Sequence, residues 1–148
     1  MLRGRHEHTI DDKGRLAIPV RFRSDLQAFG EDAPIVVTNY DKCLLAYPLK
    51  EWEDLEERVD QLAFDPRVDA FQRFFFSGAT ECQIDKAGRI LIPPSLRDFA
   101  GLTHETVIIG KLRKFEIWSK DAWTKEFSEI LDQFRPITSA LSQLGIKL

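Results

Sequence analysis

Residues 10–23 read IDDKGRLAIPVRFR, and residues 84–97 read IDKAGRILIPPSLR. The two stretches agree at seven positions, in the pattern I-D-x-x-G-R-x-x-I-P-x-x-x-R, at a separation of 74 residues. Two copies this far apart are too few and too widely spaced for a solenoid, in which many short repeats stack on their neighbours. The pattern therefore predicts one small module that is duplicated within a single chain.

The similarity between the two halves continues after the repeated stretch. Residues 35–37 (IVV) correspond to residues 107–109 (VII), and residues 43–47 (CLLAY) correspond to residues 114–118 (KFEIW). Each half then continues into a helical pattern, with a tryptophan at an equivalent place. The predicted order is a hairpin, a short helical turn, a second hairpin and a longer helix, all of it twice.

The first copy predicts a β-hairpin of residues 8–11 and 15–18 around a tight loop. Gly14 supplies the positive φ that such loops usually need. Alternation along the second strand places Leu16 and Ile18 on one face, and Pro19 then opens a short helical turn through residue 23. A second hairpin is predicted from residues 35–38 and 44–47, and the second half repeats both hairpins near 80–92 and 106–118.

Two longer helical stretches follow the hairpins. Residues 49–76 predict a pair of helices, because apolar residues recur at helical spacing and Asp65-Pro66 is a helix start signal. Ser119 is a suitable N-cap for a last helix whose apolar stripe consists of Trp123, Phe127, Ile130 and Phe134. Pro136 is predicted to end that helix and to leave a C-terminal tail.

These elements predict an α+β fold made of two tandem β-hairpin modules with helices appended to each half. Its parts are a first module (1–50), a helical connection (51–76), a second module (77–120), and a C-terminal helix and tail (121–148). About four short strands per half would leave exposed sheet edges. One solution is that the two halves pair with each other and close a β-barrel by exchanging hairpins. Three consecutive phenylalanines at 74–76 cannot all face one core, which favours self-assembly.

The composition is that of an ordinary soluble protein. No apolar run approaches the ~20 residues of a membrane span, and the charged N-terminus does not resemble a secretory signal. Cys43 and Cys82 lack metal-ligand spacing and lie in apolar strand patterns. We expect two buried thiols in a cytoplasmic protein rather than a disulfide.

The net charge of −3 argues against a nucleic-acid partner, but its distribution does not. Residues 1–23 hold six Lys and Arg against three Asp and Glu, for a net charge of +3, and the remainder carries −6. The local field decides where a polyanion docks. The N-terminal stretch therefore predicts a basic, anion-binding face.

Each copy of the repeat places an Asp and an Arg on either side of a tight loop. In a purely structural interpretation the Asp fixes the turn through backbone N–H groups, and the Arg pairs with it. In the functional interpretation the loop tip presents its cations to a ligand. We favour function for the first copy, with Asp11, Lys13, Gly14, Arg15, Arg3 and Arg5 as the candidate DNA-binding residues. For the second copy, Asp85, Lys86, Gly88 and Arg89, both interpretations stay open, with DNA or a neighbouring subunit as the contact.

The functional interpretation has a specific chemistry. An arginine donates two hydrogen bonds to O6 and N7 of guanine in the major groove, and this groove is wide enough for a two-stranded β-ribbon. Lys is a point charge suited to phosphate, and neighbouring arginines would hold the DNA backbone and set the register.

Enzymatic catalysis has no support in the sequence. It contains no nucleophile elbow, no Walker loop and no dinucleotide-binding glycine pattern. His6 and His8 alternate on one strand face, but two imidazoles alone make a poor metal site, and a solvated or phosphate-facing pair is the better interpretation. We expect no cofactor, no metal, no small-molecule substrate and no membrane.

The two D-x-x-x-R loops, each running into R-x-x-I-P, and the opening M-x-R-G resemble the MraZ family, bacterial relatives of the AbrB and SpoVT regulators. The resemblance runs from Arg3 to the helix ending near Phe134, and residues 78–82 (GATEC) add to it. It implies tandem AbrB-like modules that form a swapped-hairpin (double-split) β-barrel with appended helices. It also implies ring-like homo-oligomers and a cytoplasmic, nucleoid-associated regulator that binds double-stranded DNA. The implied targets are short G-rich direct repeats upstream of the division and cell-wall gene cluster, which begins with the family member's own gene.

A second hypothesis is an antitoxin-like, protein-interaction module. Antitoxins with AbrB-like folds neutralise partner proteins through extended tails. The segment 137–148, with Leu141, Leu144 and Leu148, is the candidate tail here. DNA binding is the preferred function of the two.

Overall fold

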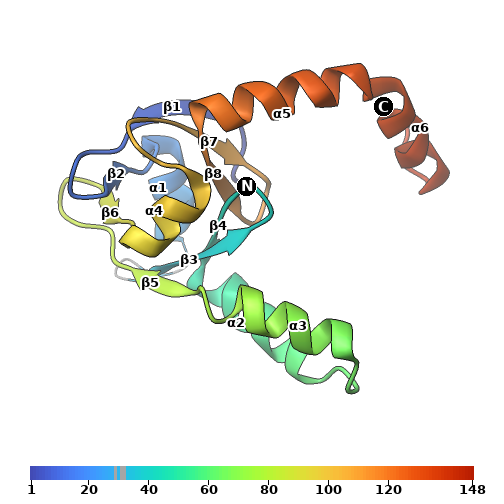
Figure 1. Ribbon diagram of the computed structural model, residues 1–148, viewed down its shortest axis with the longest axis horizontal. Coiled ribbons are helices and arrows are strands. Elements are labelled where there is room, and N and C mark those ends of the chain that lie inside the picture. Colours follow the sequence, from blue (N-terminus) through green and yellow to red (C-terminus); the bar gives the residue numbers. More distant parts are fainter. Residues whose placement is uncertain (29, 31–32) are drawn as a thin grey trace.

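The computed structural model describes residues 1–28, 30 and 33–148 (Figure 1). The first half runs, in order, through β1 (Arg5–Thr9), β2 (Arg15–Ala17), α1 (Val20–Gln27), β3 (Ile35–Tyr40), β4 (Cys43–Pro48), α2 (Leu49–Asp60) and α3 (Pro66–Phe75). The second half repeats that order with β5 (Thr80–Cys82), β6 (Arg89–Leu91), α4 (Pro94–Ala100), β7 (Glu105–Gly110), β8 (Phe115–Ser119), α5 (Lys120–Asp132) and α6 (Phe134–Gln143). The predicted α+β class and the duplication are both confirmed.

The sheets are built by pairing strands of one half with strands of the other. A six-stranded antiparallel sheet has the order β1-β7-β8-β4-β3-β5, and β2 pairs with β6 in a separate two-stranded sheet. The pairs β1–β7, β4–β8, β3–β5 and β2–β6 each join the two halves. The predicted pairing between the halves is therefore confirmed, in the form of two antiparallel sheets.

The first predicted hairpin is split between these two sheets. Within the described residues its strands meet only near the loop, at a bridge between Ile10 and Leu16 and a bond from Asp11 N–H to Arg15 O of 3.0 Å. Beyond the loop, β1 pairs with β7 and β2 pairs with β6. The split satisfies more backbone N–H and C=O groups than one short, isolated hairpin would. The second hairpin forms as predicted, but β3 and β4 are longer and leave only Asp41 and Lys42 in the turn.

The larger core lies where the two copies of the repeat meet. Leu16 and Ile18 of the first copy and Ile90 and Ile92 of the second are all fully buried in one cluster with Phe22, Phe115 and Ile117. The apolar positions of the repeat thus supply both sides of one core. This confirms the prediction that Leu16 and Ile18 share one face, and the structure shows that this face is the inner one.

A second core lies on the outer face of β3 and β4, under the hairpin of α2 and α3 (Figure 1). The ring of Trp52 stacks on the ring of Phe75 with centroids 5.4 Å apart, and it meets Tyr47 edge-on. Phe75 is 2% exposed while its neighbour Phe74 is 45% exposed. The prediction that the three consecutive phenylalanines cannot share one core is therefore confirmed.

The C-terminal helix differs from the prediction at Pro136. Ser119 caps α5 as predicted, its hydroxyl accepting from Ala122 N–H at 3.1 Å. The helix ends at Asp132, and a further helix, α6, begins at Phe134 and contains Pro136 in its first turn. A proline is tolerated there because first-turn N–H groups have no intrahelical partner. The predicted termination by Pro136 is wrong, and much of the predicted tail is helical.

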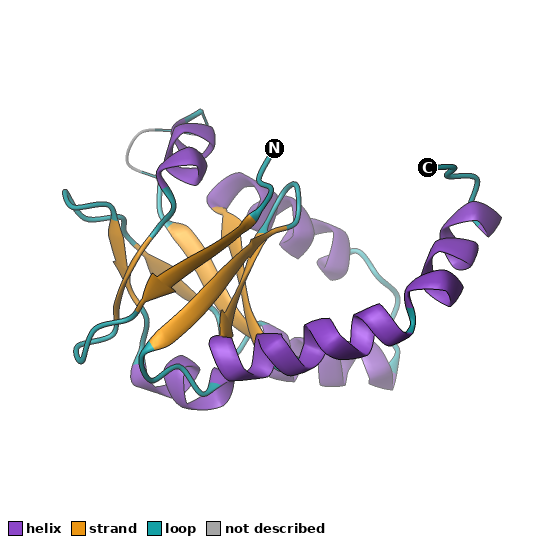
Figure 2. Cartoon of the chain, turned by 90° about the horizontal axis from the view of Figure 1, so that it is seen from above, coloured by secondary structure: helices purple, strands orange, loops and turns teal. Residues whose placement is uncertain are grey.

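Helix α6 lies away from the sheets, at the far end of α5, in both views (Figures 1 and 2). Its residues are exposed or half-exposed, and none is buried. Its apolar positions, Phe134, Ile137, Leu141 and Leu144, recur at helical spacing. The helix therefore presents an amphipathic surface without an intramolecular partner in the described structure.

Cys43 and Cys82 are free and buried, as predicted. Burial raises the pKa of the Cys82 thiol to about 11 and raises the pKa of the Cys43 thiol still further. Both thiols are therefore protonated and unreactive at neutral pH. Among the described helices, none has the length and apolarity needed to cross a membrane.

Candidate nucleic-acid interface

The first Asp–Arg loop is held closed by the carboxylate of Asp11. One oxygen, Oδ1, accepts from the backbone N–H of Lys13 at 3.0 Å and of Arg15 at 2.9 Å. The other, Oδ2, accepts from Arg15 Nε at 2.6 Å. Gly14 lies inside the turn at φ +88°, and its N–H donates to Asp11 O. These hydrogen bonds hold the turn closed, and the bond from Nε to Asp11 orients the guanidinium of Arg15.

The second loop repeats this geometry at the equivalent atoms. Asp85 Oδ1 accepts from Ala87 N–H and Arg89 N–H, both at 2.9 Å, and Asp85 Oδ2 accepts from Arg89 Nε at 3.2 Å. The backbone N–H of the arginine is the main reason that the pKa of each aspartate lies below its usual value. The structural interpretation, in which Asp fixes the turn and pairs with Arg, describes both copies.

The two loops lie next to each other because β2 pairs with β6. Ile18 N–H donates to Gly88 O at 2.9 Å, and Ile92 N–H donates to Gly14 O at 2.8 Å. Each loop is therefore hydrogen-bonded to the strand end of the other half, and the loops of β1–β2 and β5–β6 lie at one end of the molecule (Figures 1 and 2). The chain builds one composite surface from two sequence-distant copies.

An arginine from each half also packs across the loop of the other. Arg97 donates through Nε to Ile92 O at 3.0 Å and lies directly against Gly14, where an added Cβ would meet Arg97 Nε at 2.7 Å. In the reciprocal position, the guanidinium of Arg23 covers Gly88. Arg23 and Arg97 are equivalent residues at the last identical position of the repeat. The arginine of each copy therefore packs on the loop of the other copy.

The cations of the two loops face solvent. Lys13 and Lys86 are exposed, and the side chains of Arg15 and Arg89 are 38% and 37% exposed. Since the contact with Asp uses only Nε, the Nη nitrogens stay available as a fork of donors. The surface presents two arginine forks and two lysines on rigid turns.

Arg3 and Arg5 are not part of this loop surface. Arg5 stands at the start of β1, so about 20 Å of strand separates it from Asp11 at ~3.3 Å per residue. Its guanidinium carbon lies 4.8 Å above the ring of Phe127 on α5. The basic side chains of residues 1–23 therefore do not form one continuous face.

The two histidines of β1 lie on the less exposed face of the strand. Both are half-buried, and the ring of His6 meets the ring of Phe22 edge-on at 5.0 Å. Burial, followed by the nearby His6, lowers the pKa of His8. The imidazole of His6 therefore packs on a core side chain, in contrast to the solvated or phosphate-facing pair that we expected, while His8 keeps part of its surface exposed. No group of three or more possible metal ligands is found among the described residues.

The bracing by Arg23 and Arg97 was not predicted from the sequence. The signal was present, because this arginine is one of the seven identical positions of the repeat. What it contacts is decided by the pairing of β2 with β6, which no local pattern specifies.

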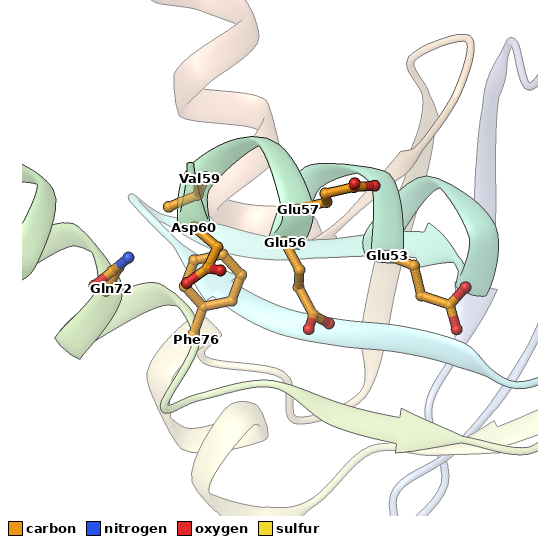
Figure 3. Close-up of a pocket in the computed structure, with 7 residues that line it drawn as sticks. All are labelled: Glu53, Glu56, Glu57, Val59, Asp60, Gln72 and Phe76. Carbon is orange, nitrogen blue, oxygen red and sulfur yellow. The ribbon is translucent and has the colours of Figure 1, made fainter. Parts of the chain in front are cut away.

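Negatively charged side chains cluster on the hairpin of α2 and α3. A groove of about 510 Å³ is lined there by Glu53, Glu56, Glu57, Val59, Asp60, Gln72 and Phe76 (Figure 3). Figure 1 places this hairpin away from the two Asp–Arg loops. Its carboxylates would repel phosphate, so this hairpin is an unfavourable face for a polyanion.

The geometry therefore defines a duplicated module with twin Asp–Arg turns on a shared two-stranded sheet. A family model described as "MraZ protein, putative antitoxin-like" matches the chain twice, over residues 1–74 and 75–143. The chain belongs to the MraZ family, which consists of transcriptional regulators rather than enzymes.

Curated relatives match over nearly their full length. The transcriptional regulator MraZ of Desulfitobacterium hafniense is 46% identical over 147 residues, covering 99% of this chain and 100% of the relative. That of Pelotomaculum thermopropionicum is 46% identical over 99% of both chains, and that of Moorella thermoacetica is 42% identical over 99% of this chain and 100% of its own.

The low pKa of Asp11 predicts a pH dependence of stability. Since the folded pKa lies below the unfolded value, the stabilisation is fully present above the unfolded pKa of about 3.8 and is lost as pH falls through the folded pKa. In urea unfolding at pH 5, 4 and 3, the wild type should lose more stability on acidification than Asp11→Asn. The adjacent, exposed Asp12 supplies the control, since Asp12→Asn should follow the wild type. Identical acid profiles for Asp11→Asn and wild type would show that the carboxylate does not hold the turn.

Proposed function

We propose that this protein is a sequence-specific, DNA-binding transcriptional regulator that reads DNA with the loop of residues 11–15. The observation that carries the proposal is the pair of adjacent Asp–Arg turns, each holding an arginine fork and a lysine at the molecular surface. Relatives described as transcriptional regulators match the chain from end to end, which supports it.

Each residue of the first loop has a separate task. Arg15 offers its Nη donors to O6 and N7 of guanine in the major groove, while Asp11 holds the guanidinium in position and does not face the DNA itself. Lys13 contacts phosphate as a point charge. Gly14 keeps the turn tight, so the tip can approach the bases.

The second loop lies beside the first and presents Lys86 and Arg89. Two contacts are compatible with its geometry: the DNA that flanks the first contact, or a neighbouring subunit. Arg89→Ala separates them, since a DNA contact predicts weaker binding by an intact assembly and a subunit contact predicts a smaller assembly. Arg3 and Arg5, which lie away from the loops, are assigned the weaker role of sequence-independent phosphate contacts.

The target that we propose is a set of short direct repeats upstream of the division and cell-wall gene cluster, including the protein's own gene. A chain with a net charge of −3 binds DNA weakly by itself. Several copies in a ring-like homo-oligomer, each reading one repeat, would raise the apparent affinity by roughly 10² or more through linked binding. Such a regulator acts in the cytoplasm, on the nucleoid.

The test is a gel-shift titration of the upstream DNA at two salt concentrations, with a matched fragment whose repeats are scrambled. We expect a shift that requires the repeats and weakens at the higher salt. Equal binding to both fragments would mean that the affinity is non-specific and would contradict sequence-specific recognition. No shift at either salt would overturn the proposal.

A second candidate is the antitoxin-like role, which the exposed apolar face of α6 favours. It predicts a protein partner that binds the full chain and is lost from a chain truncated after Gln133. The truncated chain keeps the loop surface, so a protein partner that binds the full chain and not the truncated one would support this role, and a full chain that binds no protein partner would contradict it.

A further inference from the structure

The internal repeat places two equivalent aromatic sites on the outer faces of the sheet, and only one of them is covered. In the first half, Trp52 of α2 packs on Tyr47 of β4 and is 5% exposed. In the second half, Trp123 of α5 packs on Trp118 of β8 with ring centroids 5.6 Å apart, but Trp123 stays half-exposed. The difference arises from the next helix along the chain in each half.

In the first half, the next helix folds back over the site. The connection from α2 to α3 contains residues 61–65, and α3 lays Phe75 flat on Trp52 at 5.4 Å and places Phe71 behind it. Five residues are enough for an antiparallel helical hairpin. The first half thus shows what this aromatic site accepts: the apolar face of an amphipathic helix.

In the second half, the next helix cannot fold back over the site. Only Gln133 separates α5 from α6, which is too short for a helical hairpin. Helix α6 lies beyond the end of α5 (Figures 1 and 2). A groove of about 340 Å³ stays open beside Trp123, between α5 and the sheet, and its apolar lining includes Tyr40, Ile109, Trp118, Trp123 and Ile130.

The charges of the groove and of α6 are complementary. Asp41, Glu116 and Glu126 line the groove, but Lys111 pairs with Glu116 and Lys42 pairs with Glu126, each at 3.4 Å, so the rim keeps an excess of one carboxylate. Residues 133–148 carry Arg135 and Lys147 and contain no Asp or Glu. Helix α6 itself carries one charged side chain, Arg135, so an exposed apolar helix with a single positive charge matches an open apolar groove whose rim has a small negative excess.

We propose that helix α6 of a second copy of this chain docks in the groove beside Trp123, taking the place that α3 occupies over Trp52 in the first half. The contact joins two different surfaces, so successive copies can close a ring or, by reciprocal exchange, a dimer. This contact would be the surface through which the chain self-associates. The inference therefore rests on the ring-like homo-oligomer of the proposed function. DNA does not enter its test, so the outcome is independent of DNA recognition.

The first experiment measures the mass of the full-length chain in solution by size-exclusion chromatography with light scattering. Leu141→Glu places a charge on the apolar face of α6, and Ile130→Glu places one in the groove. We expect each to reduce the assembly toward the 17.1 kDa monomer. The matched controls Ser139→Glu and Ser128→Glu lie on the opposite faces of the same helices and should keep the wild-type mass. A monomeric wild type, or variants with the wild-type mass, would overturn the proposal.

The second experiment tests which residues are in contact. Its result does not depend on whether Ile130→Glu disturbs α5. Two differently tagged single variants, Ile130→Cys and Ile137→Cys, are mixed and oxidised. We expect a disulfide-linked heterodimer carrying both tags. Cross-linking of Ile137→Cys to itself would indicate helix-to-helix pairing instead. A link formed within one chain by the double variant, with no linked dimer, would show that α6 covers its own groove. Either result contradicts the proposal.

Discussion

Gly14→Ala is expected to lower the free energy of unfolding by about 2–6 kcal/mol, the sum of two costs that are each on the order of 1–3 kcal/mol. The backbone at Gly14 has φ +88°, a region that residues with a Cβ rarely adopt. In addition, a Cβ there would lie 2.7 Å from Ile92 O, a backbone atom of the residue that directly follows β6. That oxygen cannot move without disturbing the pairing of the two halves.

Two other glycines separate these costs. Gly101 has φ +65° and nothing within 4 Å of the position that a Cβ would take, so Gly101→Ala should carry only the conformational cost of about 1–2 kcal/mol. A Cβ at Gly88 would meet only the side chain of Arg23, which can move aside, so Gly88→Ala should lie between the two. The measurement is urea unfolding followed by tryptophan fluorescence. Equal losses at Gly14 and Gly101 would show that the contact with Ile92 carries no cost.

Arg15→Ala is expected to weaken binding to the repeat DNA by about 5- to 150-fold for each lost bidentate contact, which corresponds to ~1–3 kcal/mol. The loss should be larger for an assembly that reads several repeats, because it is incurred at each one. Binding to scrambled DNA should change much less, since the fork reads a base edge. Fluorescence anisotropy on both DNA sequences gives the two affinities.

Arg67→Ala is the matched control for Arg15→Ala. Arg67 also pairs with an aspartate, Asp65, at 2.8 Å, but it lies on the acidic hairpin of α2 and α3. The two variants have the same charge change and a similar lost ion pair. Similar affinities in both variants would mean that charge alone, rather than the position of Arg15, determines binding.

The sequence predicted the features that depend on local rules. The tight turns at Gly14 and Gly88 result from the glycine and the Asp–Arg pattern, and the shared face of Leu16 and Ile18 results from alternation. The cap at Ser119 results from its hydroxyl. All of these depend on residues a few positions apart.

The features that the sequence did not predict depend on distant contacts. Strand β1 leaves its own hairpin for β7, where Thr106 Oγ1 donates to His8 O at 2.7 Å. Arg97 reaches the loop of the other half only because β2 and β6 are paired. Pro136 indicated a helix end, but its effect depends on its position in the helix, and the break falls at Gln133.

The central claim, that the loop of residues 11–15 faces DNA, is tested most directly by site-specific photo-cross-linking to the repeat DNA. A photoreactive side chain replaces Lys13 in one variant and Glu56, in the acidic groove, in the other. We predict a covalent complex with the repeat DNA from position 13, suppressed by unlabelled repeat DNA, and none from position 56. Cross-linking from position 56, or from neither position while DNA binding persists, would contradict the account.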